Sequence, residues 1–268
     1  MKTALIVVPA YNESLRLPRL LGEIKAYFES GLQDAEGLQV RFVVVDDGSR
    51  ADEAVREAEL VRQLQLGDAV AFLRLESNRG KGGAVRAGFD LAVRDGLAFT
   101  GFIDCDSSVS ILEMHRALVC LKRENDANDV AGLIGSRVRM LGRHVERSAL
   151  RHYTGRIFAT FVGLYFQCGA YDTQCGLKLF RTDALVRYLH VPSDQRWIWD
   201  TQLLLAMLHG GETIHELPVD WQERDGSKIS VGRDSLRMVW GLVKFRRRLR
   251  GVVDARSGRH PPDGSARD

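Results

Sequence analysis

Residues Val43 to Ser49 read VVVDDGS, in which three valines lead directly into two aspartates, a glycine and a serine. Such a β-branched apolar run is typical of a buried central strand in a parallel sheet. Similar short runs recur in the first half of the chain, and the predicted strands are Ala4–Val8, Val40–Val45, Ala69–Arg74, Phe99–Ile103 and Gly132–Gly135. Longer stretches with helical periodicity lie among them, and the predicted helices are Leu17–Ser30, Asp52–Leu64 and Gly83–Asp95. This alternation predicts an α/β fold with a mostly parallel sheet flanked by helices.

The chain has 268 residues, of which 45% are hydrophobic and 27% are charged, with 26 glycines and a formal net charge of +3. These values exclude collagen-like, coiled-coil, low-complexity and disulfide-scaffold proteins. The charge is too small to indicate nucleic-acid binding by itself. A chain of this length buries about 70% of its unfolded surface, so we expect one catalytic domain over residues 1–232. The polar residues 252–268 predict a disordered tail.

The cysteines and apolar runs bear on the compartment. Cys105, Cys120, Cys168 and Cys175 form no CxxC pair and no zinc-ligand spacing, which favours reduced thiols in a cytosolic protein. The first apolar run is interrupted at once by a proline, so it is not a secretory signal. The longest uncharged stretch, Ile157–Tyr171, is shorter than the roughly 20 residues of a spanning helix. We therefore expect no segment that crosses a membrane.

Polar residues follow the predicted strands, where open α/β sheets bind their ligands. Val8–Glu13 reads VPAYNE, a strand that leads into a turn exposing Tyr11, Asn12 and Glu13. In the DDGS turn, Asp46 and Asp47 could accept hydrogen bonds from a base or a ribose, and the alternative is an aspartate-rich turn that caps a helix.

A glycine-rich basic segment, Asn78–Gly88, reads NRGKGGAVRAG and opens a predicted helix. Its backbone N–H groups, the helix dipole and the Lys81 ammonium are placed to face an anion. The glycine spacing matches neither the Walker A pattern nor GxGxxG, so the segment argues against a P-loop NTPase and a dinucleotide-binding protein.

Phe102–Ser108 reads FIDCDSS, so a predicted strand ends in Asp104 and Asp106, one residue apart. Two neighbouring carboxylates repel each other unless a cation lies between them, and hard oxygen ligands suit Mg²⁺ or Mn²⁺. The sequence predicts a metal site here that also carries substrate phosphates. The alternative is a pair of solvated turn carboxylates.

These four segments, in this order and at these intervals, resemble the family 2 glycosyltransferases, whose fold is the Rossmann-like GT-A fold. Segments of the second half resemble the dolichyl-phosphate β-glucosyltransferase branch, to which polyprenyl-phosphate mannosyltransferases are closely related. They read GSR at Gly135–Arg137, RSALR at Arg147–Arg151, DTQCGLKLF at Asp172–Phe180, RWIWDTQLL at Arg196–Leu204 and VDWQERDGSK at Val219–Lys228. The similarity extends over about residues 3 to 250.

The resemblance implies transfer, with inversion, of a sugar from a nucleotide-diphosphate sugar to a polyprenyl phosphate, with UDP-glucose as the favoured donor. It implies a nucleoside site, and its residues are Pro9, Tyr11, Glu13 and Asp46 or Asp47. Asp104 and Asp106 would hold Mg²⁺ or Mn²⁺ on the diphosphate. Lys81 and Lys228 would stabilise the negative charge of the leaving nucleoside diphosphate.

The acceptor phosphate is already anionic, so it needs a cationic pocket in line with the sugar and no strong general base. By resemblance, Arg137, Arg147 and Arg151 form that pocket; the alternative is a solvated basic surface. Asp200, in RWIWD, would orient the hydroxyls of the donor sugar. Residues Asp172–Gln174 are candidates to line the sugar pocket, and the apolar residues that follow them are expected in the core.

Two residues depart from the pattern of the family. The metal motif reads DCDSS where the family has DAD, and Gln202 stands where glutamate is common. Both departures bear on the choice of sugar and remove no residue that the reaction needs.

Residues Arg233–Gly251 carry seven basic residues and one acidic residue, a net charge of +6. On a helical wheel, Arg237, Gly241, Lys244 and Arg248 share one side and a wide apolar arc faces the other. This pattern is typical of an amphipathic helix at an anionic membrane surface. A core-packed terminal helix and a nucleic-acid arm are the alternatives, of which the second is disfavoured.

The apolar segment Ile157–Phe166 is a second candidate for contact with the bilayer or the prenyl chain, or else it is buried core. We expect a peripheral protein on the cytoplasmic face of a membrane. The sequence leaves the oligomeric state open.

Other functions remain open at this point. One is transfer from GDP-mannose, and another is transfer to a glycan or protein hydroxyl, with Asp200 as a general base. A third is a membrane-bound module that binds nucleotide sugars without turnover, although such a module has no need of the two metal-site aspartates. A sugar nucleotidyltransferase is disfavoured because VPAYNE is not its N-terminal signature.

Overall fold

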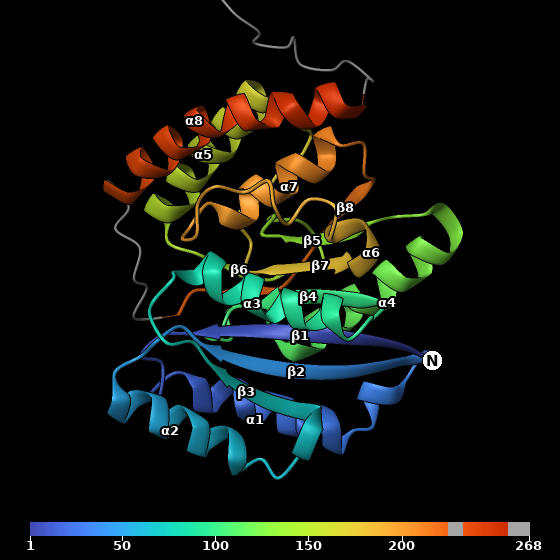
Figure 1. The fold of residues 1–268 in the computed structure, drawn as a ribbon, viewed down its shortest axis with the longest axis vertical. Helices are drawn as coiled ribbons and strands as arrows, with labels where there is room; N and C mark the ends of the chain where they lie inside the picture. The colour runs from blue at the N-terminus through green and yellow to red at the C-terminus, as the bar shows by residue number, and fades with distance from the viewer. Residues whose placement is uncertain (225–232, 257–268) are drawn as a thin grey trace, which may run out of the picture.

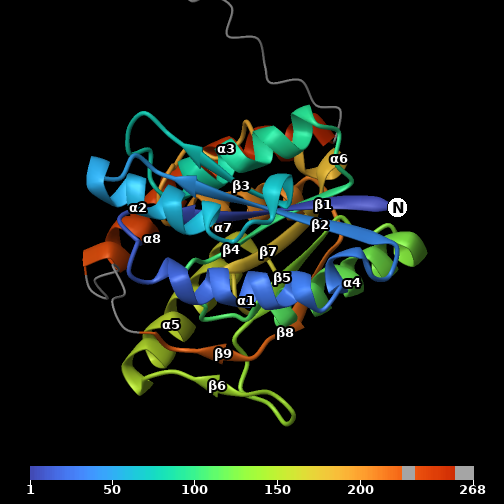
Figure 2. The same ribbon diagram turned by 90° about the horizontal axis from the view of Figure 1, so that it is seen from below.

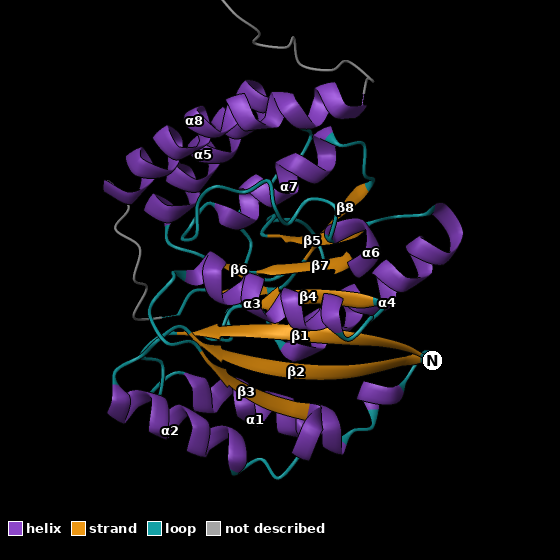
Figure 3. Cartoon of the chain, in the orientation of Figure 1, coloured by secondary structure: helices purple, strands orange, loops and turns teal. Residues whose placement is uncertain are grey.

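The computed structural model describes residues 1–224 and 233–256, with the side chains of the second stretch described from 237 to 252. A seven-stranded mixed sheet has the order β3-β2-β1-β4-β7-β5-β8, and a small second sheet pairs β6 with β9 (Figures 1 and 3). The strands are β1 Lys2–Ala10, β2 Leu38–Asp46, β3 Val70–Arg74, β4 Phe99–Ile103, β5 Gly132–Ser136, β6 Val145–Glu146, β7 Leu177–Arg181, β8 Ile214–Pro218 and β9 Trp221–Gln222. The α-helices are α1 Leu17–Glu29, α2 Ala51–Arg62, α3 Lys81–Arg94, α4 Ile111–Asn128, α5 Ala149–Phe166, α6 Thr182–Leu185, α7 Trp199–His209 and α8 Arg233–Arg256.

The parallel half of the sheet confirms the predicted strands and helices, with bounds that differ by a few residues at some ends. β1 pairs in parallel with both β2 and β4, and β2 pairs in parallel with β3. Ala10 lies opposite Asp46, so β1 and β2 end side by side, and their arrowheads point to the same edge in Figure 1. The turns that follow these strands therefore meet at one edge of the sheet.

β7 was not predicted as a strand, because its apolar residues indicated only core. It lies between β4 and β5 and runs antiparallel to both. Since Leu177 at its start lies opposite Ile103 at the end of β4, the residues that precede β7 reach the same edge as the carboxyl ends of β1, β2 and β4. This reversal brings the second half of the chain to the ligand edge of the first half.

Apolar side chains cover both faces of the sheet. One cluster joins alternate residues of β1 and β2 to buried residues of α1 and α4, and the other joins the remaining residues to α3, α5, α7 and α8. Seen from below, the sheet lies between α3 on one side and α1 and α4 on the other (Figure 2). Because successive side chains of a strand point to opposite faces, the sheet has one apolar core on each face, as expected for a three-layer α/β protein.

α8 packs one face on the protein. Met238, Leu242, Phe245 and Leu249 are all buried at spacings of four, three and four residues. The predicted wheel is wrong for Gly241, because a Cβ there would lie 2.4 Å from Cδ1 of Ile198. Core packing therefore accounts for one face of this helix, and its other face carries the charges.

α8 also extends beyond its predicted end. It ends at Arg256 rather than Gly251, so residues 252–256 of the predicted tail are helical. Helix propagation adds one hydrogen bond for each residue, which favours extension once a helix is docked. Residues 257–268 lie outside the described part of the chain.

The structure bears on two predictions, one about the cysteines and one about membrane-spanning segments. The four cysteines form no disulfide. Across residues 1–224 and 233–256, no helix has both the length and the hydropathy that spanning a bilayer requires.

The packing of α8 predicts unequal effects of truncating its two faces. Phe245 is 1% exposed, so Phe245→Ala should lower the free energy of unfolding by about 3–5 kcal/mol. Trp240 is 65% exposed, and Trp240→Ala should change it by less than about 0.5 kcal/mol. Urea unfolding followed by circular dichroism measures both. Equal, small effects would mean that α8 does not pack on the core.

Candidate active site

An open cavity of about 200 Å³ lies at the carboxyl edge of the sheet. Acidic and basic side chains line it together: Lys81, Asp104, Asp106, Arg137, Arg147, Arg151, Asp200 and Arg224. The aspartates predicted for a metal and the arginines predicted for an acceptor phosphate therefore share one cavity, although they lie far apart in the sequence.

The acidic wall lies at the end of β4. Lys81 Nζ, at the start of α3, is 2.6 Å from Asp104 Oδ1, and Asp106 accepts the Ser108 N–H at 2.9 Å. Burial raises the pKa of Asp104, Lys81 acts in the opposite sense, and Asp106 raises it further. A Cβ on Gly176 would lie 2.2 Å from Asp104 Oδ2, so only glycine allows the preceding loop to pass this close.

This carboxylate pair fits a hard divalent cation. Asp104 and Asp106 both line the cavity, and within residues 1–224 and 237–252 no group of three or more carboxylate, histidine or cysteine side chains forms a complete metal site. Mg²⁺ commonly takes one or two carboxylates and completes its shell with substrate phosphates and water. The wall therefore suits a metal that arrives with a diphosphate.

The glycine-rich segment does not offer its first backbone donors to a ligand, so that part of the prediction is wrong. The N–H groups of Arg79 and Gly80 donate to the two carboxylate oxygens of Asp47, at 2.7 and 2.8 Å. An internal carboxylate already occupies the position where an external anion was expected. Lys81 remains, with its ammonium in the cavity.

The following glycines serve close packing. The N–H groups of Gly82 and Gly83 donate to the carbonyl oxygens of Arg196 and Gln195. A Cβ on Gly82 would lie 2.3 Å from Cβ of Trp199, the first residue of α7. The segment thus holds α3 directly against the start of α7, which carries Asp200.

The predicted nucleoside residues gather where β1 and β2 end. Asp46 and Asp47 are buried, and Asp46 accepts the Ser49 N–H at 2.9 Å. Pro9 is buried within β1, while Tyr11 is 39% exposed. The binding of a nucleoside by these residues stays a prediction. Lys228, which was predicted to stabilise the diphosphate, lies outside the described residues.

Glu57 of α2 supports this turn and was missed in the sequence. Its Oε1 accepts the Glu13 N–H at 2.6 Å, while Glu53 accepts the Ser14 N–H at 3.4 Å. Burial raises the pKa of Glu57 to about 7, and the Asp46 charge contributes. The buried face of α2 carries Glu53, Glu57 and Val61 at helical spacing. This spacing was the available signal in the sequence that both glutamates face inward.

The basic wall begins with Arg137 after β5. Its guanidinium forms a two-pronged ion pair with Asp172, at 2.6 and 2.8 Å. Burial lowers the pKa of Arg137 but the Asp172 charge outweighs this and raises it, and the same pair holds the pKa of Asp172 below its usual range despite burial. Asp172, a candidate for the sugar pocket, thus fixes Arg137 in place.

Arg147 has little compensation for its charge. Burial, then the neighbouring Arg137 charge, lower its pKa to about 10. Its buried Nε has no hydrogen-bond partner and it forms no ion pair within the described part of the chain. The guanidiniums of Arg137 and Arg147 lie 5.7 and 5.9 Å from the ring centre of Trp221, and Arg151 pairs with Glu223 at 3.1 Å. A partly buried cation in this state is suited to an anionic ligand.

Arg224 also lines the cavity and was missed. It follows β9, and its buried Nε has no partner among the described residues. The VDWQERDGSK segment is part of the family resemblance, which implied a role for Lys228 but none for Arg224. The available signal was an aromatic residue and a basic residue close together in WQER, just after β8.

Asp200 and Gln202 have different surroundings. Asp200 lines the cavity from the first turn of α7. Gln202 is 1% exposed, and its Oε1 accepts the N–H groups of Ser193 and Asp194 at 2.8 and 3.0 Å. Gln202 therefore stabilises the preceding loop and is not among the residues that line the cavity.

Comparison with known proteins identifies the family. Residues 5–189 match the profile of glycosyl transferase family 2. The chain belongs to glycosyl transferase family 2. A family 2 relative from Saccharomyces cerevisiae, named dolichyl-phosphate beta-glucosyltransferase, is 31% identical over 254 residues, which cover 90% of this chain and 73% of the relative. A protein of the same name from Drosophila melanogaster is 35% identical over 247 residues, covering 88% and 73%.

A solved structure confirms the fold of this family 2 chain. Glucosyl-3-phosphoglycerate synthase from Mycobacterium tuberculosis, in complex with Mn²⁺, UDP-glucose and phosphoglyceric acid, aligns with a TM-score of 0.60 at 14% identity. The alignment covers 91% of this chain and 79% of the synthase. The predicted Rossmann-like GT-A fold is thereby confirmed.

The raised pKa of Glu57 predicts a pH-dependent stability. A carboxyl that holds its proton more tightly when folded stabilises the protein fully below about pH 4.5, and this contribution is lost as the pH rises through about 7. Glu57→Gln keeps an acceptor for Glu13 and never ionises. At pH 8 it should raise the stability by about 3 kcal/mol, or roughly 8 °C in Tm, and at pH 5.5 by only about 1 kcal/mol.

Thermal unfolding of both proteins at the two pH values measures this difference. Glu59→Gln is the matched control, because Glu59 is exposed on the same helix. An equal change in Tm at both pH values would contradict the assignment.

Proposed function

We propose that this chain is a metal-dependent, inverting glycosyltransferase that moves glucose from UDP-glucose to a polyprenyl phosphate of the dolichyl type. The names of its relatives and the UDP-glucose bound by a protein of the same fold support the donor and the acceptor. The observation that carries the proposal is the pairing of an aspartate wall with an arginine wall across one cavity.

The arginine wall fits an acceptor that is itself an anion. A phosphate monoester is ionised at neutral pH, so its oxygen attacks the sugar without a strong general base. Arg147 and Arg224 each have a buried Nε donor without a partner in the part of the chain that the structure describes, and Asp172 holds Arg137 in the same wall. These guanidiniums bind the phosphate and hold it in line with the anomeric carbon.

The aspartate wall fits the donor diphosphate. Asp104 and Asp106 would hold Mg²⁺ or Mn²⁺, which supplies charge stabilisation for the leaving nucleoside diphosphate. Lys81 lies beside Asp104 and stabilises the same developing charge. Lys228 is proposed for the same role from the sequence alone.

The turns after β1 and β2 are proposed to bind the nucleoside. Tyr11 presents a half-exposed aromatic ring at the edge of the sheet. Pro9 and Glu13 belong to the same turn region and are buried. The Asp46 and Asp47 carboxylates hold the neighbouring turn in shape by accepting backbone N–H groups, and the Glu13 carboxylate pairs with Arg16.

The full chain with Mg²⁺, labelled UDP-glucose and polyprenyl phosphate should form a labelled lipid. Arg147→Ala should lower kcat/KM for the polyprenyl phosphate about 100-fold, because the acceptor loses a charged donor, and should leave KM for UDP-glucose within about threefold. Asp104→Asn should lower kcat about 100-fold or more. Steady-state kinetics with each substrate varied separates these effects.

Arg62→Ala is the matched control, since Arg62 is an exposed arginine of α2 outside the cavity. It should leave both constants within twofold. Absence of labelled lipid with UDP-glucose and also with GDP-mannose would contradict the proposed function. Labelling from GDP-mannose alone would contradict the choice of glucose.

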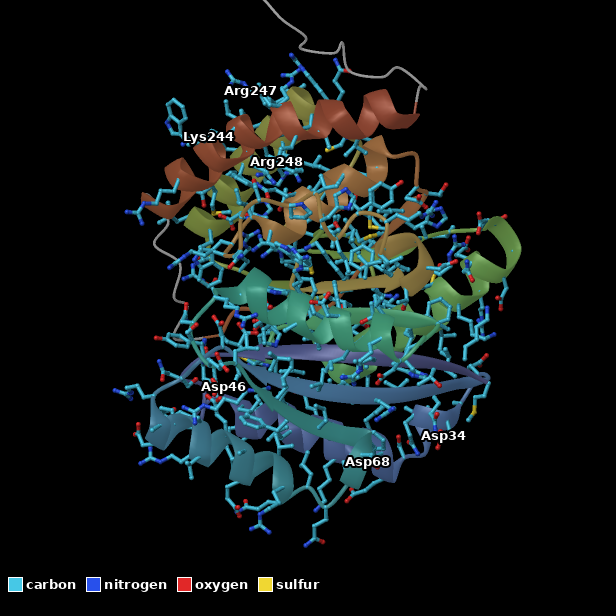
Figure 4. All side chains as sticks on the ribbon, in the orientation of Figure 1. Asp34, Asp46, Asp68, Lys244, Arg247 and Arg248 are labelled. Carbon is cyan, nitrogen blue, oxygen red and sulfur yellow. The ribbon has the colours of Figure 1, made fainter. Side chains whose placement is uncertain are left out.

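We propose further that α8 and α5 bring the cavity to a membrane. Lys244, Arg247 and Arg248 lie along α8 at the opposite end of the molecule from Asp34 and Asp68 (Figure 4). α5 lies beside α8 in Figure 1, and its exposed face carries Leu150, Tyr153, Ile157 and Leu164, which are 67–78% exposed.

The same helix α5 borders the cavity through Arg151 and Phe158. A lipid whose phosphate lies at the arginine wall can therefore extend its chain along the apolar face of α5. A basic surface suits the anionic lipids of the cytoplasmic leaflet, which supports a peripheral position on the cytoplasmic face.

Replacing Lys244, Arg247 and Arg248 together by alanine should weaken binding to vesicles with 30 mol% anionic lipid by about 100-fold at low salt, at roughly 1 kcal/mol per charge. Vesicle co-sedimentation measures this. The matched control replaces Lys25, Arg62 and Arg94, three exposed basic residues of α1, α2 and α3, and should change binding little. Equal losses in both triple variants would argue against a membrane-facing α8.

A further inference from the structure

A lysine lies in the core where an apolar residue is expected. Lys178 is the second residue of β7, and its neighbours Leu177, Leu179 and Phe180 are all buried apolar side chains. The Lys178 side chain is 0% exposed. A fully buried ammonium is strongly unfavourable unless a carboxylate and further acceptors surround it. This position therefore calls for an explanation beyond packing.

The Lys178 ammonium pairs with Asp200, a residue that lines the cavity. Its Nζ donates to Asp200 Oδ2 at 2.6 Å and to the Cys175 carbonyl oxygen at 2.8 Å. The second carboxylate oxygen, Oδ1, accepts the Thr201 N–H at 2.9 Å. Both oxygens of Asp200 are thus fixed, and each keeps acceptor capacity for a hydroxyl donor, because a carboxylate oxygen has two lone pairs.

A second ion pair stands beside this one. The Lys81 and Lys178 ammoniums lie 5.0 and 5.5 Å from the centre of the same Phe102 ring. Lys81 pairs with Asp104, and Lys178 pairs with Asp200, each at 2.6 Å. Each carboxylate therefore has its own cation.

This division matters because both ammoniums lie against the same ring, so the two ion pairs are close neighbours. Without Lys178, Asp200 would lose its partner, and the Lys81 ammonium would lie near two carboxylates. A Lys81 shared between Asp104 and Asp200 would be less available to a diphosphate.

We propose that Lys178 is a positioning residue for transfer: it fixes the Asp200 carboxylate as an acceptor for hydroxyls of the donor sugar and leaves Lys81 to the diphosphate. The inference rests on the proposed function. It assigns no proton transfer to Asp200, and Lys178 itself does not touch the substrate, since it is fully enclosed.

The test replaces Lys178 with methionine, which has a similar length and no charge. Lys178→Met should lower kcat for transfer from UDP-glucose about 100-fold, as expected for a misplaced binding group. Calorimetry should find the affinity for UDP with Mg²⁺ within threefold of wild type, and the affinity for UDP-glucose reduced toward that for UDP. Lys178→Arg restores the charge and should recover at least a tenth of the wild-type kcat.

A double-mutant cycle separates positioning from general structural support. Asp200→Asn should give a loss similar to that of Lys178→Met, and the double variant should lose no more than Asp200→Asn alone. Leu179→Met, at the next position of the same strand, controls for packing and should leave kcat within twofold. Losses that multiply in the double variant would overturn the proposal, as would a folded Lys178→Met enzyme with kcat within threefold of wild type.

Two further outcomes also decide between the proposals. If Lys178→Met alone does not fold, the double variant removes both buried charges and should fold; a kcat for it well below that of Asp200→Asn would overturn the proposal. If the wild type binds UDP-glucose but labels no lipid, the proposed function fails. The calorimetric comparison of UDP-glucose with UDP then still decides the role of Lys178.

Discussion

The separation of negative and positive charge across a single cavity is the constraint on which the rest of this structure depends. Asp104 and Asp106 end a central strand, and the arginines face them from later segments of the chain. Charges of one sign in so small a space are unfavourable without counter-ions, and both walls retain charge that the protein does not neutralise. The cavity is therefore shaped for a ligand that brings a cation to one wall and an anion to the other, as a metal-bound sugar nucleotide and a lipid phosphate do.

The antiparallel strand β7 makes this arrangement possible. A parallel strand at the same place would send the DTQCG segment to the far edge of the sheet. Reversal brings Asp172 to Arg137, places Gly176 against Asp104 and puts Lys178 beneath Asp200. Three separate features of the site thus follow from one change of strand direction.

The two outer helices present different surfaces. α8 packs its apolar face on the core and presents its basic face outward. In α5 the cavity residues lie on one side, and the other side exposes apolar residues. The two helices lie side by side, so a cationic and an apolar surface adjoin each other. That combination suits the boundary between lipid headgroups and acyl chains.

The sequence by itself determined the α/β class, the strands that end in Asp46 and Asp104, and the charged character of α8, because alternation, apolar runs and charge are properties of neighbouring residues. It did not reveal the direction of β7, the engagement of the glycine-rich N–H groups by Asp47, or the partners of Arg137 and Lys178. Those were decided only by the tertiary structure, since an ion pair depends on which distant segments burial brings within a few ångströms, and no local pattern encodes that distance.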